Sequence, residues 1–400
     1  MERDELAAWL RLALTSGVGN ASARKLLAAF GPPPSVFGQS QAALRQLVSD
    51  TQAMALLSEP PALAAQLEAT WQWLQEAVPG TQRRVLALDD ADYPGSLLNI
   101  EDPPLMLYLL GARDSEGNEP PAHTGPSQHT THLLADDLRR SLAIVGSRNP
   151  TPQGAVHAHQ FARAFSEAGL TVISGLALGI DGEAHLGALE GAAAGGQRLA
   201  TVAVVGTGLD RVYPKKHLEL AHQIARHGLI ISEFPIGTPP LAANFPKRNR
   251  ILAGLAQGTL VVEAALQSGS LITARLAAEQ GKEVFAIPGS IASTQSRGCH
   301  ALIRQGAKLV ETAQDVLEEL RLPFAHASRA AAIDTSVAPS EPLSEHSLLR
   351  QIGYEPVSLD ALQARTGLAT AQLQAQLLEL ELDGRVARLP GGLFQRMGRG

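Results

Sequence analysis

The 400-residue sequence has a single cysteine, Cys299, which excludes a disulfide framework and suits a reducing compartment. It also has no apolar run approaching the ~20 residues that a membrane-spanning helix needs. The first residues, MERDEL, carry acids and lack the apolar core of a secretory signal. We therefore expect a cytoplasmic protein that does not associate with a membrane.

The motifs of several common enzyme classes are also missing. A dinucleotide site needs GxGxxG, but the GTG at 206–208 is followed three residues later by Arg211. The glycine-rich stretch 175–179 continues without the lysine of a P-loop. No GxSxG elbow, HExxH or paired CxxC motif occurs. These absences argue against nicotinamide, P-loop, serine hydrolase and zinc chemistry, and we expect no cofactor.

Two histidine arrangements could suggest a catalytic or metal site, but each has a simpler explanation. His157 and His159 are two residues apart on a predicted helix, so they face different directions and cannot easily share a metal. Asp181 and His185 are four apart at a predicted helix start, where they could pair for acid–base catalysis. A capping role for Asp181 and a packing role for His185 are favoured. We predict no catalytic residue and no metal site.

Basic residues are in the minority, and the formal net charge is −6 at pH 7. This balance argues at first against a nucleic-acid partner, but the charge is unevenly distributed. Residues 1–139 hold 9 basic and 17 acidic side chains, whereas residues 140–320 hold 16 and 14. With 45% hydrophobic residues the chain can form two or three domains, and only the central part has a cationic surplus.

From residue 141 onward, short β-rich runs alternate with amphipathic helical segments, which is the pattern of a parallel sheet covered by helices. Ligands of such sheets bind beyond the carboxyl ends of the strands, so the turns after the strands should converge on one edge. We predict an α/β fold with a mostly parallel sheet. The expected strands are 142–145, 170–174, 199–205, 229–232, 259–262, 284–287 and 308–310.

Three cations fall within four residues in the stretch NFPKRNRILAGL at 244–255. Pro246 suits a first helical turn, and the apolar run 251–256 predicts a short helix whose positive N-terminus the cations would crowd. A bound anion would remove that conflict, because helix N-termini bind phosphate. Phe245 offers a ring on which a base could stack. Taken alone, the cluster is more simply a solvated basic loop that pairs with surface acids.

The turns after the predicted strands offer further groups that bind anions. Arg148 directly follows the first central strand and could form a phosphate fork. Tyr213 and Lys215 follow the third strand, and residues 268–270 open the helix after the fifth. Several separate phosphate contacts fit an extended polyanion better than one nucleotide. The rings of Tyr213 and Phe245 favour unstacked single strands over a duplex.

The N-terminal part is predicted to form short helices. Segments 2–14 and 21–30 have helical apolar spacing and flank the turn TSGVGN, as in a helix–hairpin–helix. Such a turn can bind phosphate, but the acidic surroundings favour a structural connection. Two strand-like runs follow between 84 and 111, and the polar, aperiodic residues 112–138 indicate an insertion loop.

The C-terminal part is predicted to be a winged helix–turn–helix after a linker rich in Ala, Ser and Pro. Its third helix would be the recognition helix of a duplex-binding domain, but it has no Lys or Arg and three acids. We therefore predict an interaction or regulatory module, with at most weak DNA contact through Arg385, Arg388 and Arg396 in the wing. The expected elements are helices 344–352, 358–365 and 370–383 and strands 385–389 and 393–397.

Five ordered motifs resemble those of the DNA-processing protein A family, also called Smf. They are YPGSLLNIEDPPLMLY (93–108), AIVGSR (143–148), SGLALGIDGEAH (174–185), GTGLDRVYP (206–214) and NFPKRNRILAGL (244–255), and the resemblance covers nearly the whole chain. It implies an extended Rossmann-like domain that binds single-stranded DNA, in a protein without catalytic turnover. That protein would form a homodimer, protect incoming DNA, and load the recombinase RecA onto it in natural transformation.

By position in those motifs, the resemblance implies a DNA pocket of cationic, aromatic and turn residues. The expected nucleic-acid-binding residues are Gly146, Ser147, Arg148, Ser174, Gly175, Gly206, Gly208, Lys215, Asn244, Phe245, Lys247, Arg248, Asn249, Arg250, Ser268, Gly269 and Ser270. The expected domains are an N-terminal helical SAM-like or helix–hairpin–helix domain (1–78), the Rossmann-like domain (82–320, with the insertion loop 112–138), a linker (321–344) and the winged helix (345–400).

Two other functions remain open. A nucleotide phosphoribohydrolase on a related scaffold is suggested by GTLVVE at 258–263, which slightly resembles a G-T-x-x-E element, although the PGG run expected before it is absent. Glu263 could instead brace the neighbouring helix. A duplex-binding regulator would lose most of its DNA affinity on deletion of residues 345–400, whereas the single-strand hypothesis expects binding to survive that deletion largely intact.

Overall fold

The computed structural model describes residues 1–76, 80–112, 138–193, 199–320 and 356–397, together with residues 348, 349 and 352. The predicted linker 321–344 lies outside the described residues, as do residues 113–137 of the predicted insertion loop and most of the predicted helix 344–352. Across the described ranges, no helix is both long and apolar enough to cross a membrane.

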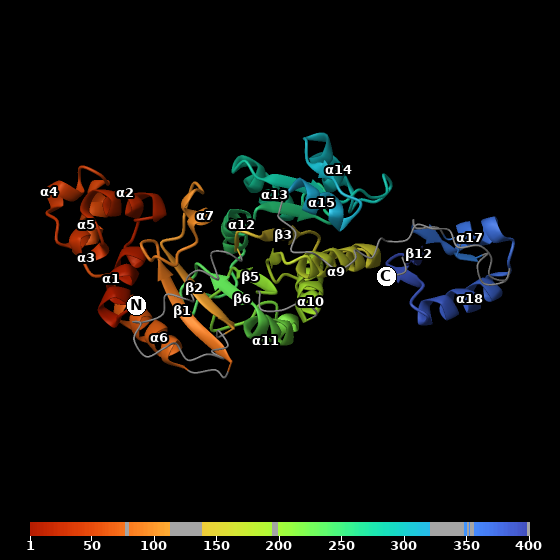
Figure 1. The fold of residues 1–400 in the computed structure, drawn as a ribbon, viewed down its shortest axis with the longest axis horizontal. Coiled ribbons are helices and arrows are strands. Elements are labelled where there is room, and N and C mark those ends of the chain that lie inside the picture. The colour runs from red at the N-terminus through yellow and green to blue at the C-terminus, as the bar shows by residue number, and fades with distance from the viewer. Residues whose placement is uncertain are drawn as a thin grey trace.

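The N-terminal part folds as a group of short helices, as the sequence predicts (Figure 1). The helices are α1 (Arg3–Leu14), α2 (Asn20–Phe30), α3 (Pro33–Phe37), α4 (Gln41–Leu44), α5 (Asp50–Leu57) and α6 (Leu63–Gln75). Leu6, Trp9 and Leu10 of α1 are buried, and their apolar cluster continues to Tyr108 in the central domain. The helical group is therefore packed onto the sheet through a shared core.

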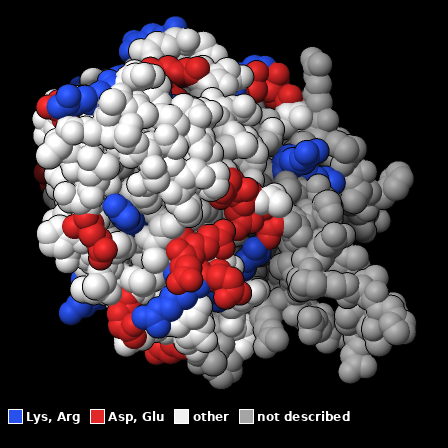
Figure 2. Space-filling view, turned by 90° about the vertical axis from the view of Figure 1, so that its left-hand side faces the viewer, with Lys and Arg blue, Asp and Glu red and all other residues white. Residues whose placement is uncertain are grey.

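The predicted helix–hairpin–helix turn is bound to the central domain at its end. The Asn20 side-chain amide donates to carboxylates of Asp102 (3.2 Å) and Glu233 (3.1 Å). Because this side chain is hydrogen-bonded within the protein, the contacts support the interpretation of the turn as a structural connection. Acidic side chains, with basic ones beside them, also gather on the face that this end of the molecule presents (Figure 2).

A nine-stranded sheet forms the centre of the molecule. The strands are β1 (Thr81–Ala87), β2 (Met106–Ala112), β3 (Ser141–Val145), β4 (Thr171–Ser174), β5 (Thr201–Val205), β6 (Leu229–Ser232), β7 (Gly258–Val261), β8 (Glu283–Ala286) and β9 (Lys308–Leu309). Their order is β1-β2-β6-β5-β4-β3-β7-β8-β9. The seven strands from β3 onward run parallel and confirm the predicted strands. Strands β1 and β2 pair antiparallel and extend the sheet beyond β6.

Helices cover both faces of the sheet, because the parallel strands carry apolar side chains in both directions. In β5, for example, Val202 and Val204 face one core cluster while Ala203 and Val205 face another. One face is covered by α9 (Pro152–Glu167), α10 (Ile180–Ala193), α11 (Leu218–His227) and α15 (Ala313–Glu319). The other is covered by α7 (Gly95–Leu98), α12 (Asn244–Leu255), α13 (Ser270–Glu279) and α14 (Arg297–Arg304) (Figure 1).

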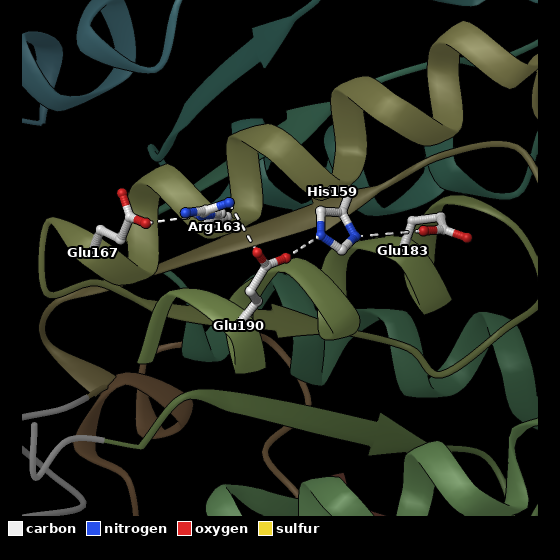
Figure 3. A network of polar contacts seen from close by, with 5 residues as sticks. All are labelled: His159, Arg163, Glu167, Glu183 and Glu190. Atoms are coloured by element: carbon white, nitrogen blue, oxygen red, sulfur yellow. Dashed lines mark hydrogen bonds and ion pairs between the residues drawn. The ribbon is translucent and has the colours of Figure 1, made fainter. Parts of the chain in front are cut away.

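Helices α9 and α10 pack closely, because α10 has glycines where it meets α9. A Cβ atom on Gly187 would overlap the carbonyl of His159, and one on Gly191 would lie 2.5 Å from the carbonyl oxygen of Arg163. Charged side chains then join the two helices along their outer edge (Figure 3). We call this group the α9/α10 network, and its members are His159, Arg163, Glu167, Glu183 and Glu190.

The C-terminal part is a winged helix, as the sequence predicts. It contains β10 (Val357–Ser358), α17 (Leu359–Thr366), α18 (Thr370–Leu382), β11 (Val386–Leu389) and β12 (Leu393–Arg396), with the strands in the order β10-β12-β11. The Ser358 hydroxyl accepts a hydrogen bond from the backbone N–H of Ala361 and so caps α17. Gly367 ends this helix with a φ of +69°, a conformation that glycine adopts without strain.

Candidate nucleic-acid interface

The parallel strands leave a cavity of about 780 Å³ at their carboxyl ends. It lies where the strand order reverses, since β3 pairs with β4 on one side and with β7 on the other. Open α/β sheets bind their ligands at this position. We call the cavity the groove. The expected site residues that line it are Gly146, Ser147, Arg148, Phe245, Arg248, Asn249, Ser268, Gly269 and Ser270.

One wall of the groove combines a cation with two aromatic rings. The Arg148 guanidinium lies over the Phe245 ring, 5.4 Å from its centroid, and the Tyr213 and Phe245 ring centroids are 5.8 Å apart. Phe245 in turn packs against Gly206, where a Cβ atom would lie 3.2 Å from the ring. Arg148 is exposed and has no ion pair within the part of the chain that the structure describes. Its charge therefore remains available to an anion.

A second cation, Arg248, lies on the floor of the groove with only 4% of its surface exposed. Its guanidinium donates to the carbonyl of Val204 and fills the space above Gly175, where a Cβ atom would overlap it. Burial lowers the pKa of Arg248 to about 10, and the charge of Asp181 opposes this shift. Arg248 is therefore held inside the protein, which differs from the solvated cluster of cations that the sequence suggested.

The predicted helix at 251–256 is longer than expected, because α12 begins at Asn244. The Asn244 side-chain amide is buried and donates to the carbonyl of Gly206 (3.0 Å), which ties the start of the helix to the turn after β5. At about 100° per residue, this start places Arg248, Phe245 and Asn249 on the groove side of α12.

The other expected cations do not line the groove. Lys247 is exposed on α12, and Lys215 is exposed on the short helix η1 (Lys215–His217). Arg250 is only 13% exposed at its side chain and forms ion pairs with Glu233 and Asp102. The sequence did not indicate these two partners of Arg250, although Glu233 directly follows β6, at the sheet edge where site residues are expected.

Three further expected residues are used inside the fold. The Ser174 hydroxyl donates to the Ile144 carbonyl (2.7 Å), and the Gly208 N–H donates to the Thr238 carbonyl (3.0 Å). Gly175 leaves room for the Arg248 guanidinium. These residues lie behind the groove lining and help to define its shape. That they contact DNA directly stays a prediction.

The start of α13 supplies donors on the opposite wall. Gly269 precedes the helix without a side-chain cap, and the Ser268 hydroxyl accepts from the Ser270 N–H at 3.3 Å. The Asn249 side-chain amide donates to the Gly269 carbonyl (3.4 Å) and so holds this turn beside α12. A helix N-terminus carries a partial positive charge and amide donors, which suit a phosphate.

Asp181 and His185 are held by structural hydrogen bonds. The His185 Nε2 atom accepts from the Leu176 N–H (3.3 Å), so the Nδ1 atom carries the proton and donates to the Thr201 hydroxyl (2.7 Å). Burial lowers the pKa of His185 to about 3, which keeps it neutral. The Asp181 carboxylate accepts from the Ala177 N–H (3.3 Å). Both side chains order the turn after β4, where Leu176 has a φ of +57°.

Glu263, the residue on which the hydrolase alternative depends, caps a helix. Its carboxylate accepts from the Thr151 N–H (2.9 Å) and hydroxyl (2.5 Å) at the start of α9. Gly154 leaves space for this carboxylate, which a Cβ atom there would overlap. Burial raises the pKa of Glu263, and it is not among the residues that line the groove. This geometry supports the bracing role that the sequence left open.

Two family profiles match the central and C-terminal parts of the chain. The profile of the family described as DNA recombination-mediator protein A matches residues 130–321, and that of the DprA winged helix domain matches residues 333–392. The chain is 38% identical to the protein Smf of Escherichia coli over 330 residues, which cover 82% of this chain and 80% of that protein.

Two further similarities involve Streptococcus pneumoniae. The DNA processing protein DprA of that organism is 44% identical over 232 residues, which cover 58% of this chain and 72% of that protein. An X-ray structure of DNA processing protein A from Streptococcus pneumoniae matches with a TM-score of 0.61 at 33% identity, covering 80% of this chain and 98% of that one.

Proposed function

The chain belongs to the DNA recombination-mediator protein A family, and from this premise we propose that it binds single-stranded DNA in the groove without catalytic turnover. The observation that supports this most directly is Arg148, which is exposed, stacked on Phe245, and without an ion pair among the described residues. An arginine in this position can bind a phosphate while the adjacent rings stack on a base.

The opposite wall supports the same ligand. The N-terminus of α13 offers amide donors to a phosphate, and Arg248 adds positive charge from the floor of the groove. Phosphate-binding groups on two walls, with aromatic rings on one of them, suit a nucleic-acid strand. Because a base can stack on Phe245 or Tyr213 only after it leaves its own helix, the groove favours single strands over duplex.

The winged helix is proposed to contribute little to this binding. Helix α18, in the position of a recognition helix, has the sequence TAQLQAQLLELEL without a basic residue. Arg388 and Arg396 in the wing are the basic groups of its two longer strands. We keep 1–78, 82–320, 321–344 and 345–400 as proposed domain boundaries. Deletion of residues 345–400 should leave most of the single-strand affinity, and loss of that affinity would favour a duplex-binding regulator.

The test is a competition titration of the full chain with a fluorescent oligonucleotide at two salt concentrations, using unlabelled single-stranded or double-stranded competitor. We expect the single strand to compete more strongly and the Arg148→Ala variant to bind about 10-fold or more weakly, as the removal of a charged hydrogen bond implies. An Arg148→Ala variant with the parent's affinity, at the same melting temperature, would refute a strand in the groove.

We also propose the assembly that the family resemblance implies: a cytoplasmic homodimer that protects incoming DNA and loads RecA onto it in natural transformation. Light scattering should then give twice the 42.1 kDa of one chain. The protein should shorten the lag of RecA filament growth on strands coated with single-strand-binding protein. A lag that is unchanged by the protein would exclude the loading step while leaving strand binding intact.

A further inference from the structure

Arg250 lies in a group of polar side chains that joins the N-terminal helices to α12. Its guanidinium binds Glu233 and, through Nε, the Asp102 carboxylate at 3.3 Å. The same two carboxylates accept hydrogen bonds from the Asn20 amide at the start of α2, at 3.1 Å and 3.2 Å. We call Asn20, Asp102, Glu233 and Arg250 the clamp. It brings together residues that are far apart in the sequence.

The clamp is closed to solvent on the side of Arg250 and Glu233, whose side chains are 13% and 15% exposed. Tyr93 is buried beside it and donates to the Pro104 carbonyl (2.8 Å). Burial and the negative charge of Glu233 raise the pKa of Tyr93, while the charges of Arg250 and Arg24 oppose that shift. Arg250 is therefore paired with two carboxylates and has no excess charge to offer to a strand.

Helix geometry separates Arg250 from the groove. At about 100° per residue, Arg250 is turned by about 200° from Arg248 around α12. Arg248, Phe245 and Asn249 line the groove, whereas Arg250 contacts acids on the other side of the helix. The clamp thus holds the back of the helix whose front carries the aromatic and cationic groups of the groove.

We propose that Arg250 is a positioning residue, and that the N-terminal helices take part in strand binding through the clamp by fixing the orientation of α12. This inference rests on the proposed function. It assigns Asn20, which is far from the groove in the sequence and lies on another group of helices, a role in strand affinity. It also removes Arg250 from the set of phosphate contacts that the NFPKRNR motif suggested.

The first experiment changes the clamp from the side of the N-terminal helices. Asn20→Asp replaces the bridging amide with a third carboxylate, and we expect single-strand affinity to fall about 10-fold or more, the scale for losing a hydrogen bond to a charged group. Asp102→Asn in the same chain removes one carboxylate and should restore much of that affinity. Parent-like affinity in Asn20→Asp, or no rescue by Asp102→Asn, would overturn the proposal.

The second experiment asks whether Arg250 touches phosphate. A plot of log affinity against log salt concentration has a negative slope, and each phosphate contact of a single strand contributes about 0.7 to its magnitude. Removing one cation that binds a phosphate should therefore reduce that magnitude by about 0.7. We expect Arg250→Met to weaken binding without changing this slope, whereas Arg148→Met should reduce it. A reduced slope for Arg250→Met would show that Arg250 binds the strand directly and would overturn the proposal.

The two proposals fail in different ways. Unchanged affinity and slope in Arg148→Met would sink strand binding in the groove itself. If Arg148→Met reduces the salt slope as expected but Asn20→Asp binds like the parent, only the clamp proposal is refuted. If Arg250→Met does not fold, Arg250→Lys is the substitute. A lysine can still reach one phosphate but cannot bridge two carboxylates, so we expect weaker binding, and parent-like affinity would refute the positioning role.

Discussion

Two charged regions of the molecule use the same residue types in opposite ways. In the α9/α10 network, Arg163 binds Glu167 and Glu190 at 2.8 Å each, and His159 lies between Glu190 (2.7 Å) and Glu183 (3.6 Å) (Figure 3). In the groove, Arg148 has an aromatic ring beside it and forms no ion pair among the described residues. A cation that stabilises the fold is distinguished from one that can bind a ligand by its ion pair with an acidic side chain, more than by its charge or its exposure.

The α12 cluster contains both kinds within four residues. Arg250 is paired with Glu233 and Asp102, Arg248 is buried on the groove floor, and Lys247 is exposed. A basic cluster in a sequence therefore does not report a uniform basic surface. Each of its members has to be classified by its partners before it is assigned to DNA.

The largest expected effect is on stability, at the buried cation of the groove. Arg248→Leu leaves the buried Asp181 without its compensating charge, so we expect a loss of about 3–5 kcal/mol in the free energy of unfolding, measured by urea denaturation. Burial already raises the pKa of Asp181, and removing Arg248 raises it further. A carboxyl group whose pKa is raised by folding contributes stability below its unfolded pKa and loses that contribution as pH rises through its folded pKa. The loss of unfolding free energy in Arg248→Leu should therefore shrink toward acid pH.

The control for this prediction removes both charges. Arg248→Leu combined with Asp181→Asn should be more stable than Arg248→Leu alone, because no unpaired carboxylate remains. A double variant that is no more stable than the single one would mean that Arg248 acts through packing over Gly175 and its hydrogen bond to Val204, and the charge argument would be wrong.

The next effect is on affinity, at the aromatic wall. Phe245→Ala removes the ring that contacts both Arg148 and Tyr213, and we expect single-strand binding to weaken by about 1–3 kcal/mol, the value for loss of one stacked base. Phe245→Trp keeps a stacking face and should retain most of the affinity. Equal binding by the Ala and Trp variants in a fluorescence titration would exclude base stacking at this position.

The sheet and the position of the groove could be predicted from the sequence because both follow from local patterns. Alternating apolar runs and helices specify a parallel sheet, and the turns after Val145, Ser174, Val205 and Val261 must then meet at one edge. The winged helix could also be predicted from local signals, which are a capping serine, a turn glycine and a wing around Gly391 and Gly392.

The partners of the cations could not be predicted, because they come from distant parts of the chain. Arg250 meets Asp102 through the packing of α7 and its following loop against α12, and no spacing in the sequence relates these residues. Arg248 is buried because α12 starts at Asn244, earlier than the apolar run 251–256 indicated. A helix whose first two turns are polar has no apolar periodicity there, so its true start was hidden.

A smaller effect is expected for Lys247, the exposed cation of α12. It lies outside the groove lining, so it can reach only a strand that passes over the rim. We expect Lys247→Ala to weaken binding slightly and to reduce the salt slope by up to about 0.7, the value for one phosphate contact of a single strand. An unchanged slope would place the strand elsewhere and leave Arg148 as the principal phosphate contact.

The smallest effect on binding is expected in the α9/α10 network, where each cation already has its acid. Arg163→Met should leave single-strand affinity and its salt slope unchanged, because the charge removed was neutralised by Glu167 and Glu190. It should lower the melting temperature slightly. The His159 hydrogen bond and the Arg163 charge lower the pKa of Glu190. The stability that these interactions add is therefore present above the unfolded pKa of Glu190 and is lost as pH falls through its folded pKa. The melting difference should therefore vanish in acid, and a loss of DNA affinity in Arg163→Met would show that pairing does not separate the two kinds of cation.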